Sequence, residues 1–369
     1  MILGGALMIS LWGYGQRQSA KTFEMKGNPV ITDKFTADPA PLIHDGTLYL
    51  YVGHDEARDG EMFNITEWLC YSTKDMKTWT DHGTVLKPTD FSWAVGEAWA
   101  SQVVEKDGKF YYYTTAQAGD PYPGKAIGVA VGDTPTGPFK DAIGKPLLTT
   151  SQTQIETIDP AFFVDEDGTG YLHFGTFGTQ LAIKMKKDAT TGRTSYTETE
   201  TKTDGTTPNL HTMKDADNNA NGPKGFFEAA WVFRKGDTYY NVYDGGKPGS
   251  GTATCVESNY QACIQYSTSD SPLGPWKYQG VIVPSGSATT MHPSVLQFGD
   301  KWYVTYHTGD KEGGTDFRRA VCIDEVDWTA DGQMTSTAHP TKAEKTQPST
   351  NVASYAKVSA TFTETPAYK

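Results

Sequence analysis

A repeated hairpin pattern constrains the fold of this chain more than any other feature of its 369 residues. Five segments share one layout: a polar or aromatic residue, then small or apolar residues, a turn that contains Gly, and an aromatic strand. Two examples are DPAPLIHDGTLYLYVGHDE and EAAWVFRKGDTYYNVYDGG. The five leading residues are Asp38, Trp99, Asp159, Glu228 and His292. They lie 61, 60, 69 and 64 positions apart, so the chain repeats one supersecondary unit.

Each unit predicts a β-hairpin, because an alternating strand runs into Asp-Gly or Gly-Asp and then into a second strand. A weaker echo follows in several units, as in YSTKDMKTW at 71–79, VAVGDTPTGPF at 129–139 and YSTSDSPLGPW at 266–276. These echoes supply a third and a fourth strand, with a Trp or Phe anchoring the outer edge. Four strands repeated five times predict an all-β fold, a five-bladed β-propeller whose blades surround a central channel.

The propeller is expected to span residues 21–340. Residues 1–20 begin with the apolar run MILGGALMISLWGYG without a basic n-region, and we interpret them as an incomplete secretory signal or a disordered start. We therefore expect a secreted or periplasmic protein. Residues 341–369 are predicted to be a C-terminal tail or linker stub. The polar, Thr-rich stretch 187–224 is expected to form a long loop beside the site, or a disordered insertion without function.

The composition restricts the partners of such a propeller. A net charge of −12 would repel both phosphate backbones and anionic lipid headgroups, so we expect neither a nucleic acid nor a membrane as partner. The 9 Trp, 20 Tyr and 16 Phe residues supply aromatic faces that suit stacking on sugar rings. The sequence therefore favours a neutral, polar ligand.

The four cysteines, Cys70, Cys255, Cys263 and Cys322, show no CxxC spacing and therefore do not indicate a zinc site. Cys255 and Cys263 are close enough in sequence to form a loop disulfide, and free, partly buried thiols are the alternative.

The leading residues are the candidates for chemistry. The first strand of each blade lines the channel of a propeller, so these residues should converge on the axis. Asp38, Asp159 and Glu228 would then face one another in a confined space, an arrangement that is unfavourable unless protons are shared or a function requires it. The alternative is that these acids cap strands or bind a structural cation.

Glycosidic cleavage needs such a set, because one carboxyl group protonates the leaving oxygen and a second activates water or attacks carbon. Glu228 lies between FF and AAW, an apolar setting that should raise its pKa and make it the proton donor. Asp38 and Asp159 each precede Pro-Ala, and the proline restrains the backbone beside each carboxylate.

With these motifs in place, the sequence resembles glycoside hydrolase family 43, the inverting β-xylosidases, α-L-arabinofuranosidases and arabinanases. The resemblance covers about residues 28–335. Its specific motifs are ADPAP at 37–41, ETIDPAFF at 156–163, GFFEAAWVFRKGDTYY at 225–240 and FRRAVCID at 317–324. The resemblance implies that Asp38 is the general base, that Asp159 orients and tunes the proton donor, and that Glu228 is the general acid.

The resemblance also implies that an Arg of the last blade binds substrate hydroxyls. The register of RAVCID assigns this role to Arg319, and Arg318 beside it is the alternative.

Aromatic residues near the leading positions are candidates for a wall of the sugar site. Trp99 is the first candidate, with Trp93 and Phe227 as helpers. His54 and Asp55 follow the second strand of the first unit, where a substrate loop or an ordinary exposed turn is expected.

His292 completes the ring of five. The resemblance implies that it hydrogen-bonds a catalytic carboxylate or meets a calcium-centred water cluster, although calcium itself prefers oxygen ligands. No cofactor is required for the chemistry, and Ca²⁺ in the channel, contacted through water, is retained as an option.

The predicted function is an inverting exo-glycosidase that releases xylose or arabinose from hemicellulose, with xylo-oligosaccharides or arabinoxylan fragments as substrates. An endo-acting arabinanase is the enzymatic alternative, and a sugar-binding propeller is the non-enzymatic one. A binding propeller would keep the aromatic residues but would not need three converging carboxylates.

Overall fold

The computed structural model describes residues 20–245, 262–284 and 287–336, and the regular secondary structure of these residues is almost entirely β-strand. In these ranges the helical elements are the four-residue helix α1 (Thr150–Thr153) and one 3-10 turn (Pro88–Asp90). The all-β prediction is therefore confirmed. No helix in this part of the chain is long and apolar enough to cross a membrane.

The first sheet contains two groups of antiparallel strands. The first group consists of β2 (Thr36–His44), β3 (Thr47–Asp55), β4 (Ile65–Thr73) and β5 (Thr78–Leu86), with β1 (Lys21–Glu24) at its edge. The second consists of β6 (Ala94–Lys106), β7 (Lys109–Ala118) and β8 (Gly124–Gly132), with the short strands β9 (Lys140–Asp141) and β10 (Leu148–Thr149) beside β8. The two groups are joined through the pair Ile65 and Ala98.

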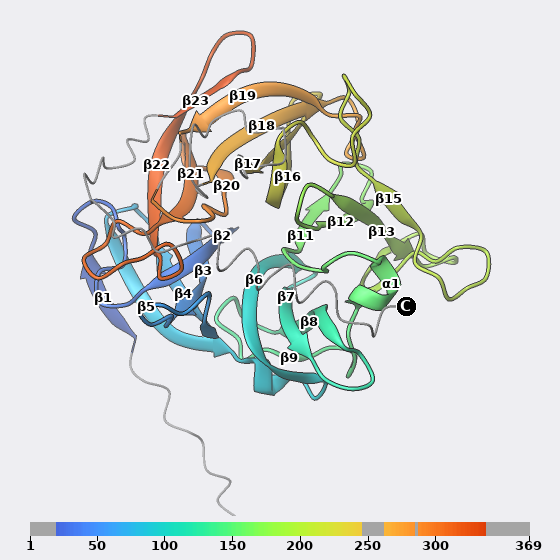
Figure 1. Cartoon of the computed structure of the whole chain (residues 1–369), viewed down its shortest axis with the longest axis horizontal. Helices are drawn as coiled ribbons and strands as arrows, with labels where there is room; N and C mark the ends of the chain where they lie inside the picture. The colour runs from blue at the N-terminus through green and yellow to red at the C-terminus, as the bar shows by residue number, and fades with distance from the viewer. Residues whose placement is uncertain (1–19, 246–261, 285–286, 337–369) are drawn as a thin grey trace, which may run out of the picture.

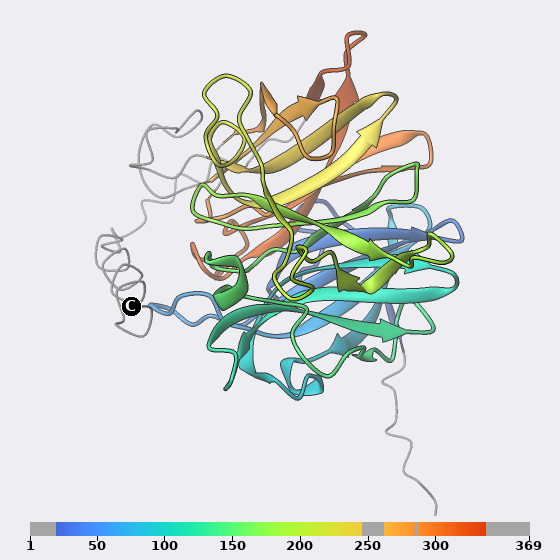
Figure 2. The ribbon, with the colours of Figure 1, turned by 90° about the vertical axis from the view of Figure 1, so that its right-hand side faces the viewer.

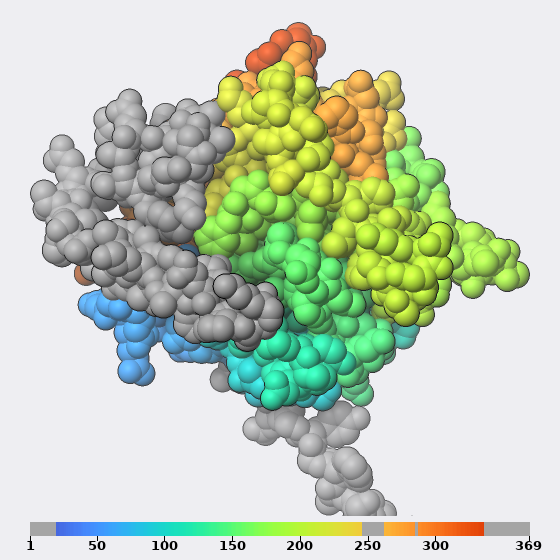
Figure 3. All heavy atoms as spheres, turned by 45° about the vertical axis from the view of Figure 1, so that its right-hand side comes forward, coloured from blue at the N-terminus to red at the C-terminus, as the bar shows by residue number. Residues whose placement is uncertain are grey.

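The third unit contains β11 (Ala161–Val164), β12 (Gly170–Phe174) and β13 (Leu181–Lys187), followed by β14 (Thr194–Thr199) and β15 (Leu210–Thr212), which both pair with β13. The expectation of one long loop over 187–224 is therefore wrong in part. Tyr196 of β14 is buried, stacks on Phe162, and its carbonyl accepts a hydrogen bond from the Tyr113 hydroxyl. This one buried aromatic residue explains why a polar segment forms an edge strand. The green to yellow-green residues after β13 contribute to the outer rim of the molecule (Figure 3).

The last two sheets have four strands each. One contains β16 (Phe226–Lys235), β17 (Thr238–Gly245), β18 (Cys263–Ser269) and β19 (Lys277–Val283). The other contains β20 (Ser294–Phe298), β21 (Lys301–Thr308), β22 (Ala320–Trp328) and β23 (Met334–Ser336).

The echo motifs form the outer strand pairs, as predicted. They connect β4 to β5, β8 to β9 and β18 to β19. Their anchoring aromatic residues Trp79, Phe139 and Trp276 are at most 5% exposed, so they fix these outer turns to the core.

The strand groups follow one another around a common centre, with β2, β6, β11, β16 and β20 innermost (Figure 1). From the side, the green strands of the third unit lie between the cyan and the yellow ones (Figure 2). The segment that leads into β2 meets the last sheet, because Val30 N–H donates to Val321 O at 2.9 Å and Thr36 N–H to Arg319 O at 2.9 Å. Strand β2 also packs against β20, β21 and β22.

The hydrophobic core lies between neighbouring groups. Tyr113 of β7 and Phe162 of β11 pack between the second and third units, and Leu50 of β3 and Ile323 of β22 pack between the first and the last. Full burial of a large apolar side chain stabilises a fold by about 1.5–3 kcal/mol. The joint between the first and last units is therefore held by apolar packing as well as by backbone hydrogen bonds.

The cysteines differ in their state. Cys70 and Cys322 are free and buried, and Cys263 is disulfide-bonded. Cys255, the predicted partner of Cys263, lies outside the described residues.

Candidate active site

Residues with a left-handed backbone lie near the start of the innermost strands β2, β11, β16 and β20. Asp38, Asp159, Ala229 and His292 have φ values of 54°, 60°, 60° and 46°. The pairing register of β2 shifts between Ala37 and Ala40, and that of β16 shifts on both sides of Glu228, so β-bulges turn these side chains away from the regular ladder. This corrects the predicted equivalence of the leading residues, because Glu228 comes one residue before the left-handed position of its unit.

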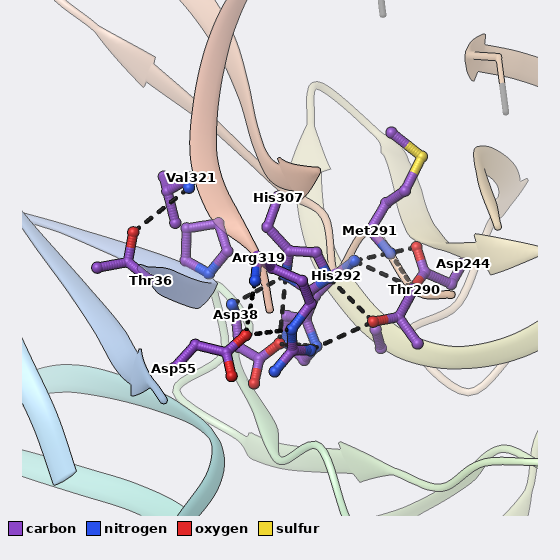
Figure 4. A network of polar contacts seen from close by, with 12 residues as sticks. Thr36, Asp38, Asp55, Asp244, Thr290, Met291, His292, His307, Arg319 and Val321 are labelled. Carbon is purple, nitrogen blue, oxygen red and sulfur yellow. Dashed lines mark hydrogen bonds and ion pairs between the residues drawn. The ribbon is translucent and has the colours of Figure 1, made fainter. Parts of the chain in front are cut away.

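Buried side chains of neighbouring units accept the backbone N–H groups of these turns. Asp38 N–H donates to His307 Nδ1 at 3.1 Å, and Ala229 N–H donates to Asp159 Oδ2 at 3.2 Å. Asp244 accepts from His292 N–H at 3.0 Å and from Met291 N–H at 2.8 Å (Figure 4). These three innermost turns are therefore each held by a polar group of another unit, which fixes where the carboxylate or imidazole points.

The charges of Asp38 and Glu228 act on Asp159, the third predicted acid. Burial and then the charges of Glu228 and Asp38 raise the pKa of Asp159 well above its usual range. The pKa of Glu228 rises to about 7, chiefly because its carboxyl group is removed from water, with a further contribution from Asp38. Glu228 is only partly exposed, and Asp38 and Asp159 are each 6% exposed. A carboxyl group with a pKa near 7 can donate a proton at neutral pH.

Arg319 joins this cluster from the start of β22. Its Nε donates to Asp55 Oδ2 at 2.7 Å, and its Nη1 lies 3.4 Å from Asp38 Oδ1 and 3.4 Å from Thr290 Oγ1 (Figure 4). The side chain is 3% exposed, and its Nη2 is buried without a hydrogen-bond acceptor among the residues described. A buried donor without an acceptor is costly, so this nitrogen is available for a ligand oxygen.

Arg318, the alternative to Arg319, points away from this cluster. Its guanidinium donates to Gly313 O, to Ala57 O and to Asp59 Oδ1, and it lies over the Phe35 ring. The expectation that Arg319 is the arginine of the channel agrees with this geometry.

Two histidines flank Asp38. His292 Nδ1 lies 3.7 Å and His307 Nδ1 3.4 Å from Asp38 Oδ1. Burial lowers the pKa of both imidazoles, so both are neutral at pH 7. Because His307 Nδ1 accepts the Asp38 N–H, we assign its proton to Nε2, which donates to Thr290 Oγ1 at 2.9 Å.

A second set of polar contacts surrounds Glu228. Thr176 Oγ1 donates to Glu228 Oε2 at 2.7 Å. Lys125 Nζ pairs with Glu156 Oε1 at 2.6 Å and lies 3.5 Å from the centroid of the Trp99 ring. The Lys125 charge lowers the pKa of Glu228 and the Glu156 charge raises it, so this pair belongs to the electrostatic surroundings of the acid.

A comparison with protein families identifies the family of the chain that carries this cluster. The family model described as glycosyl hydrolases family 43 matches residues 26–334. The chain belongs to glycoside hydrolase family 43.

Relatives in this family are similar over most of the chain. A xylosidase/arabinosidase of Bacteroides ovatus is 30% identical over 332 residues, which cover 83% of this chain and 95% of the relative. A β-xylosidase of Xylanibacter ruminicola is 30% identical over 84% of this chain and 99% of its own length.

Solved family 43 structures agree in fold. A β-xylosidase/α-arabinofuranosidase from a compost metagenome, in complex with xylotriose and in a calcium-free form, matches with a TM-score of 0.67 at 28% identity, covering 85% of this chain and 98% of its own. A Xanthomonas citri enzyme of this family in complex with xylose matches with a TM-score of 0.69 at 27% identity, covering 86% and 94%.

The three aromatic residues predicted to line the sugar site of this family 43 chain differ in their position relative to the acids. Trp99 is half-buried under Lys125 and lies 5.9 Å from the Phe63 ring. Phe227, directly before Glu228, is 4% exposed and contacts Phe177 edge-on. Trp93 is a core residue that packs on Phe91, 6% exposed, and the structure does not bring it to the acids.

His54 contributes less to the cluster than the residue after it. Its Nδ1 lies 3.1 Å from Glu67 Oε1. Asp55, in contrast, is 1% exposed and holds Arg319. The turn that could have been ordinary and exposed is therefore part of the site.

The residues around Asp38 do not fit a directly bound calcium ion, which takes six to eight oxygen ligands. Asp38 faces a guanidinium and two neutral imidazoles. In the described ranges no group of three or more His, Cys, Asp or Glu side chains is arranged to hold a metal. A contact between His292 and Ca²⁺ through water stays a prediction.

The sequence alone did not point to Asp244, His307 or Thr176, and it indicated Asp55 only as part of a substrate loop or an ordinary exposed turn. Asp55, Asp244 and His307 each lie at or near the end of a second strand, and Thr176 follows the second strand of the third unit. The common signal is a polar residue within two positions of a glycine at the end of an aromatic strand, as in VGHD, VYDGG, HFGT and YHTG.

Proposed function

We propose that this enzyme is an inverting, exo-acting β-xylosidase that also has α-L-arabinofuranosidase activity. The observation that carries the proposal is the buried carboxyl cluster in which Glu228 has a pKa of about 7 while Asp38 faces Arg319. The family membership and the names of the relatives support the substrate class, because two of them are called xylosidase/arabinosidase and β-xylosidase.

In the proposed reaction, Glu228 in its protonated form donates its proton to the glycosidic oxygen as the bond to the anomeric carbon breaks. Asp38 takes a proton from a water molecule that attacks the same carbon from the opposite face, so the configuration inverts. The proton balance is restored when Asp38 releases a proton to solvent and Glu228 takes one up.

Asp159 and Arg319 act around this exchange. Asp159 accepts the N–H of Ala229 at 3.2 Å, which fixes the backbone directly after the acid, and its proximity to Glu228 disfavours a second negative charge there. Arg319 offers its buried Nη2 to a substrate hydroxyl. A fixed donor of this kind rejects substrates that lack the hydroxyl, because the buried nitrogen then stays unpaired.

The proposed architecture is a five-bladed β-propeller over residues 21–340, with 341–369 as a tail or linker stub. The radial order of the innermost strands and the hydrogen bonds from Val30 and Thr36 to the last sheet support closure of the ring. We also propose a secreted or periplasmic location, which the disulfide of Cys263 supports because such bonds persist in oxidising compartments.

Xylo-oligosaccharides or arabinoxylan fragments are the proposed substrates. Relatives solved with xylotriose and xylose, and a Bacillus subtilis relative named arabinoxylan arabinofuranohydrolase, support this class. Endo-acting cleavage of arabinan and sugar binding without catalysis are the outcomes that would replace it.

The test is hydrolysis of 4-nitrophenyl β-xyloside and 4-nitrophenyl α-L-arabinofuranoside, with the product anomer followed by NMR. The wild type should release a sugar of inverted configuration, and Glu228→Gln and Asp38→Asn should each lose most of this activity. Glu166→Gln, at an exposed position far from the cluster, is the matched control and should match the wild type. If the folded wild type hydrolyses neither glycoside but cuts linear arabinan internally, the exo-acting assignment is wrong.

A further inference from the structure

Phe177 is an exposed aromatic residue in a strained conformation beside the acid. It lies in the connection between β12 and β13, its side chain is 48% exposed, and its φ is 52°. A bulky residue rarely adopts positive φ, and such strain persists where the surrounding structure enforces it, often at functional sites. An exposed Phe held in this way requires an explanation from its neighbours.

The connection between β12 and β13 is hydrogen-bonded to the residues directly before both Asp159 and Glu228. Gly175 N–H donates to Ile158 O at 3.0 Å, directly before Asp159, and Gly178 N–H donates to Phe227 O at 3.3 Å, directly before Glu228. Gly175 cannot be replaced without movement, because a Cβ there would lie 2.3 Å from Thr179 O. The turn that carries Phe177 is therefore tied to the two strands that present Asp159 and Glu228.

The neighbours of Phe177 place it next to the proton donor. Thr176, the preceding residue, donates its hydroxyl to Glu228 Oε2 at 2.7 Å. The Phe177 ring meets the Phe227 ring edge-on, with centroids 5.7 Å apart and an angle of 66° between the planes. Phe227 supports one side of Phe177, and nearly half of the Phe177 surface remains open to solvent.

The position of Glu228 indicates which side of the site receives the leaving group. A general acid protonates the glycosidic oxygen, so it lies beside the departing sugar, whereas the base and its water lie on the opposite face of the reacting ring. An exposed aromatic face next to the acid is thus adjacent to the unit that leaves. Aromatic rings offer a flat apolar surface to the C–H groups of a pyranose.

We propose that Phe177 is the platform for the sugar unit on the leaving-group side of the scissile bond, and that it makes the enzyme prefer leaving groups that are pyranose units over small ones. This inference rests on the proposed function. It adds Phe177, which is not among the predicted site residues, as a residue that determines specificity. The substrate class that follows is a short oligosaccharide whose second unit is a pyranose such as xylose.

The experiment compares two substrates that differ only in the leaving group, xylobiose and β-xylosyl fluoride. For Phe177→Ala, the ratio of kcat/KM for xylobiose to kcat/KM for the fluoride should fall at least tenfold, with most of the change in KM for xylobiose. Phe177→Trp should restore the ratio to within threefold of the wild type, because it returns an aromatic face. Ile43→Ala, which also removes a 41% exposed apolar side chain but at the opposite end of β2 from Asp38, should leave the ratio unchanged.

Two results would overturn the inference. Equal losses on both substrates in Phe177→Ala, in a variant whose thermal unfolding matches that of the wild type, would mean that Phe177 serves the turn and not the leaving group. Unchanged kcat/KM values for both substrates would mean that no sugar contacts this ring. If the wild type hydrolyses neither substrate, the proposed function itself fails, and the inference fails with it.

Discussion

Asp55 and Arg319 form a buried ion pair across the joint between the first and the last sheets. Asp55 Oδ2 accepts both the Nε–H of Arg319 at 2.7 Å and its backbone N–H at 2.9 Å. The two side chains are less than 4% exposed. Burial raises the pKa of Asp55 and the guanidinium opposes this shift, so the carboxylate depends on its partner. Asp55 is therefore a positioning residue that sets how Arg319 approaches Asp38.

Replacing Asp55 by Asn should loosen Arg319 and leave its charge buried without a counterion. We expect kcat/KM on 4-nitrophenyl β-xyloside to fall about a hundredfold and the free energy of unfolding to drop by about 3 kcal/mol, the usual cost of breaking a buried pair. If Asp55 had a structural role alone, Asp55→Asn would change only the free energy of unfolding. A positioning role also predicts a higher KM in Asp55→Asn, and Asp55→Glu should partly restore the wild-type KM. The control is Asp59→Asn, because Asp59 binds the neighbouring Arg318 at the surface. Normal kinetics in Asp55→Asn would refute the positioning role.

The two adjacent arginines should respond differently to the same substitution. Arg319→Lys keeps a positive charge but cannot donate to Asp55 and a substrate hydroxyl at the same time, since it lacks the planar fork of guanidinium donors. We expect kcat/KM to fall at least a hundredfold. Arg318→Lys changes a residue that binds Asp59 and two loop carbonyls, and it should stay within twofold of the wild type. Steady-state kinetics on the aryl glycosides check both, and similar losses in the two variants would contradict the assignment.

The pH dependence of the reaction should follow Glu228. The acid must be protonated, and its pKa is raised to about 7 from 4.5, so kcat/KM should fall as the pH rises through about 7. The hydrogen bond from Thr176 lowers this pKa, and Thr176→Val should therefore shift the alkaline limb to higher pH. Thr206→Val, at an exposed position between β14 and β15, is the control. An alkaline limb that moves to lower pH in Thr176→Val would show that the bond favours the protonated form instead.

Much of the fold could be predicted because the repeat is local. Each hairpin can be predicted from its own alternation of apolar and polar residues and from its Gly-containing turn. The echo motifs with Trp79 and Trp276 indicate the outer strands. The strand β14 was missed, since Tyr196 is a single buried aromatic residue in a polar segment and only its contact with Tyr113 in another sheet reveals its role. Local pattern cannot report a contact between units that lie far apart in sequence.

The same limit applies to the site. Asp38, Asp159 and Glu228 could be found because they lead repeats, but the repeat alone could not show that Ala229, and not Glu228, has the left-handed backbone. Asp55, Asp244 and His307 each accept a hydrogen bond from a backbone N–H group of another unit, and this contact defines their role in the site. Those partners are distant in sequence, and only the tertiary arrangement of the sheets brings them together.

The raised pKa of Glu228 also has a consequence for stability. A carboxyl group whose pKa is 4.5 in the unfolded chain and about 7 in the folded one disfavours folding once it ionises, so its contribution is fully present below pH 4.5 and is lost as the pH rises through 7. Glu228→Gln removes this cost and keeps an oxygen that can accept from Thr176. The difference between the two pKa values corresponds to about 3 kcal/mol at full burial. The partial exposure of Glu228 reduces the expected gain at pH 8 to about 2 kcal/mol.

Denaturant unfolding of the wild type and Glu228→Gln at pH 4 and pH 8 measures this directly. The variant should be more stable at pH 8 and equal to the wild type at pH 4, where the carboxyl group is protonated in both states. Glu166→Gln, which is 77% exposed, should show no such dependence. A gain of the same size at both pH values would arise from packing and would refute the titration of Glu228 near neutrality, and with it the argument that this residue carries the proton for the leaving group.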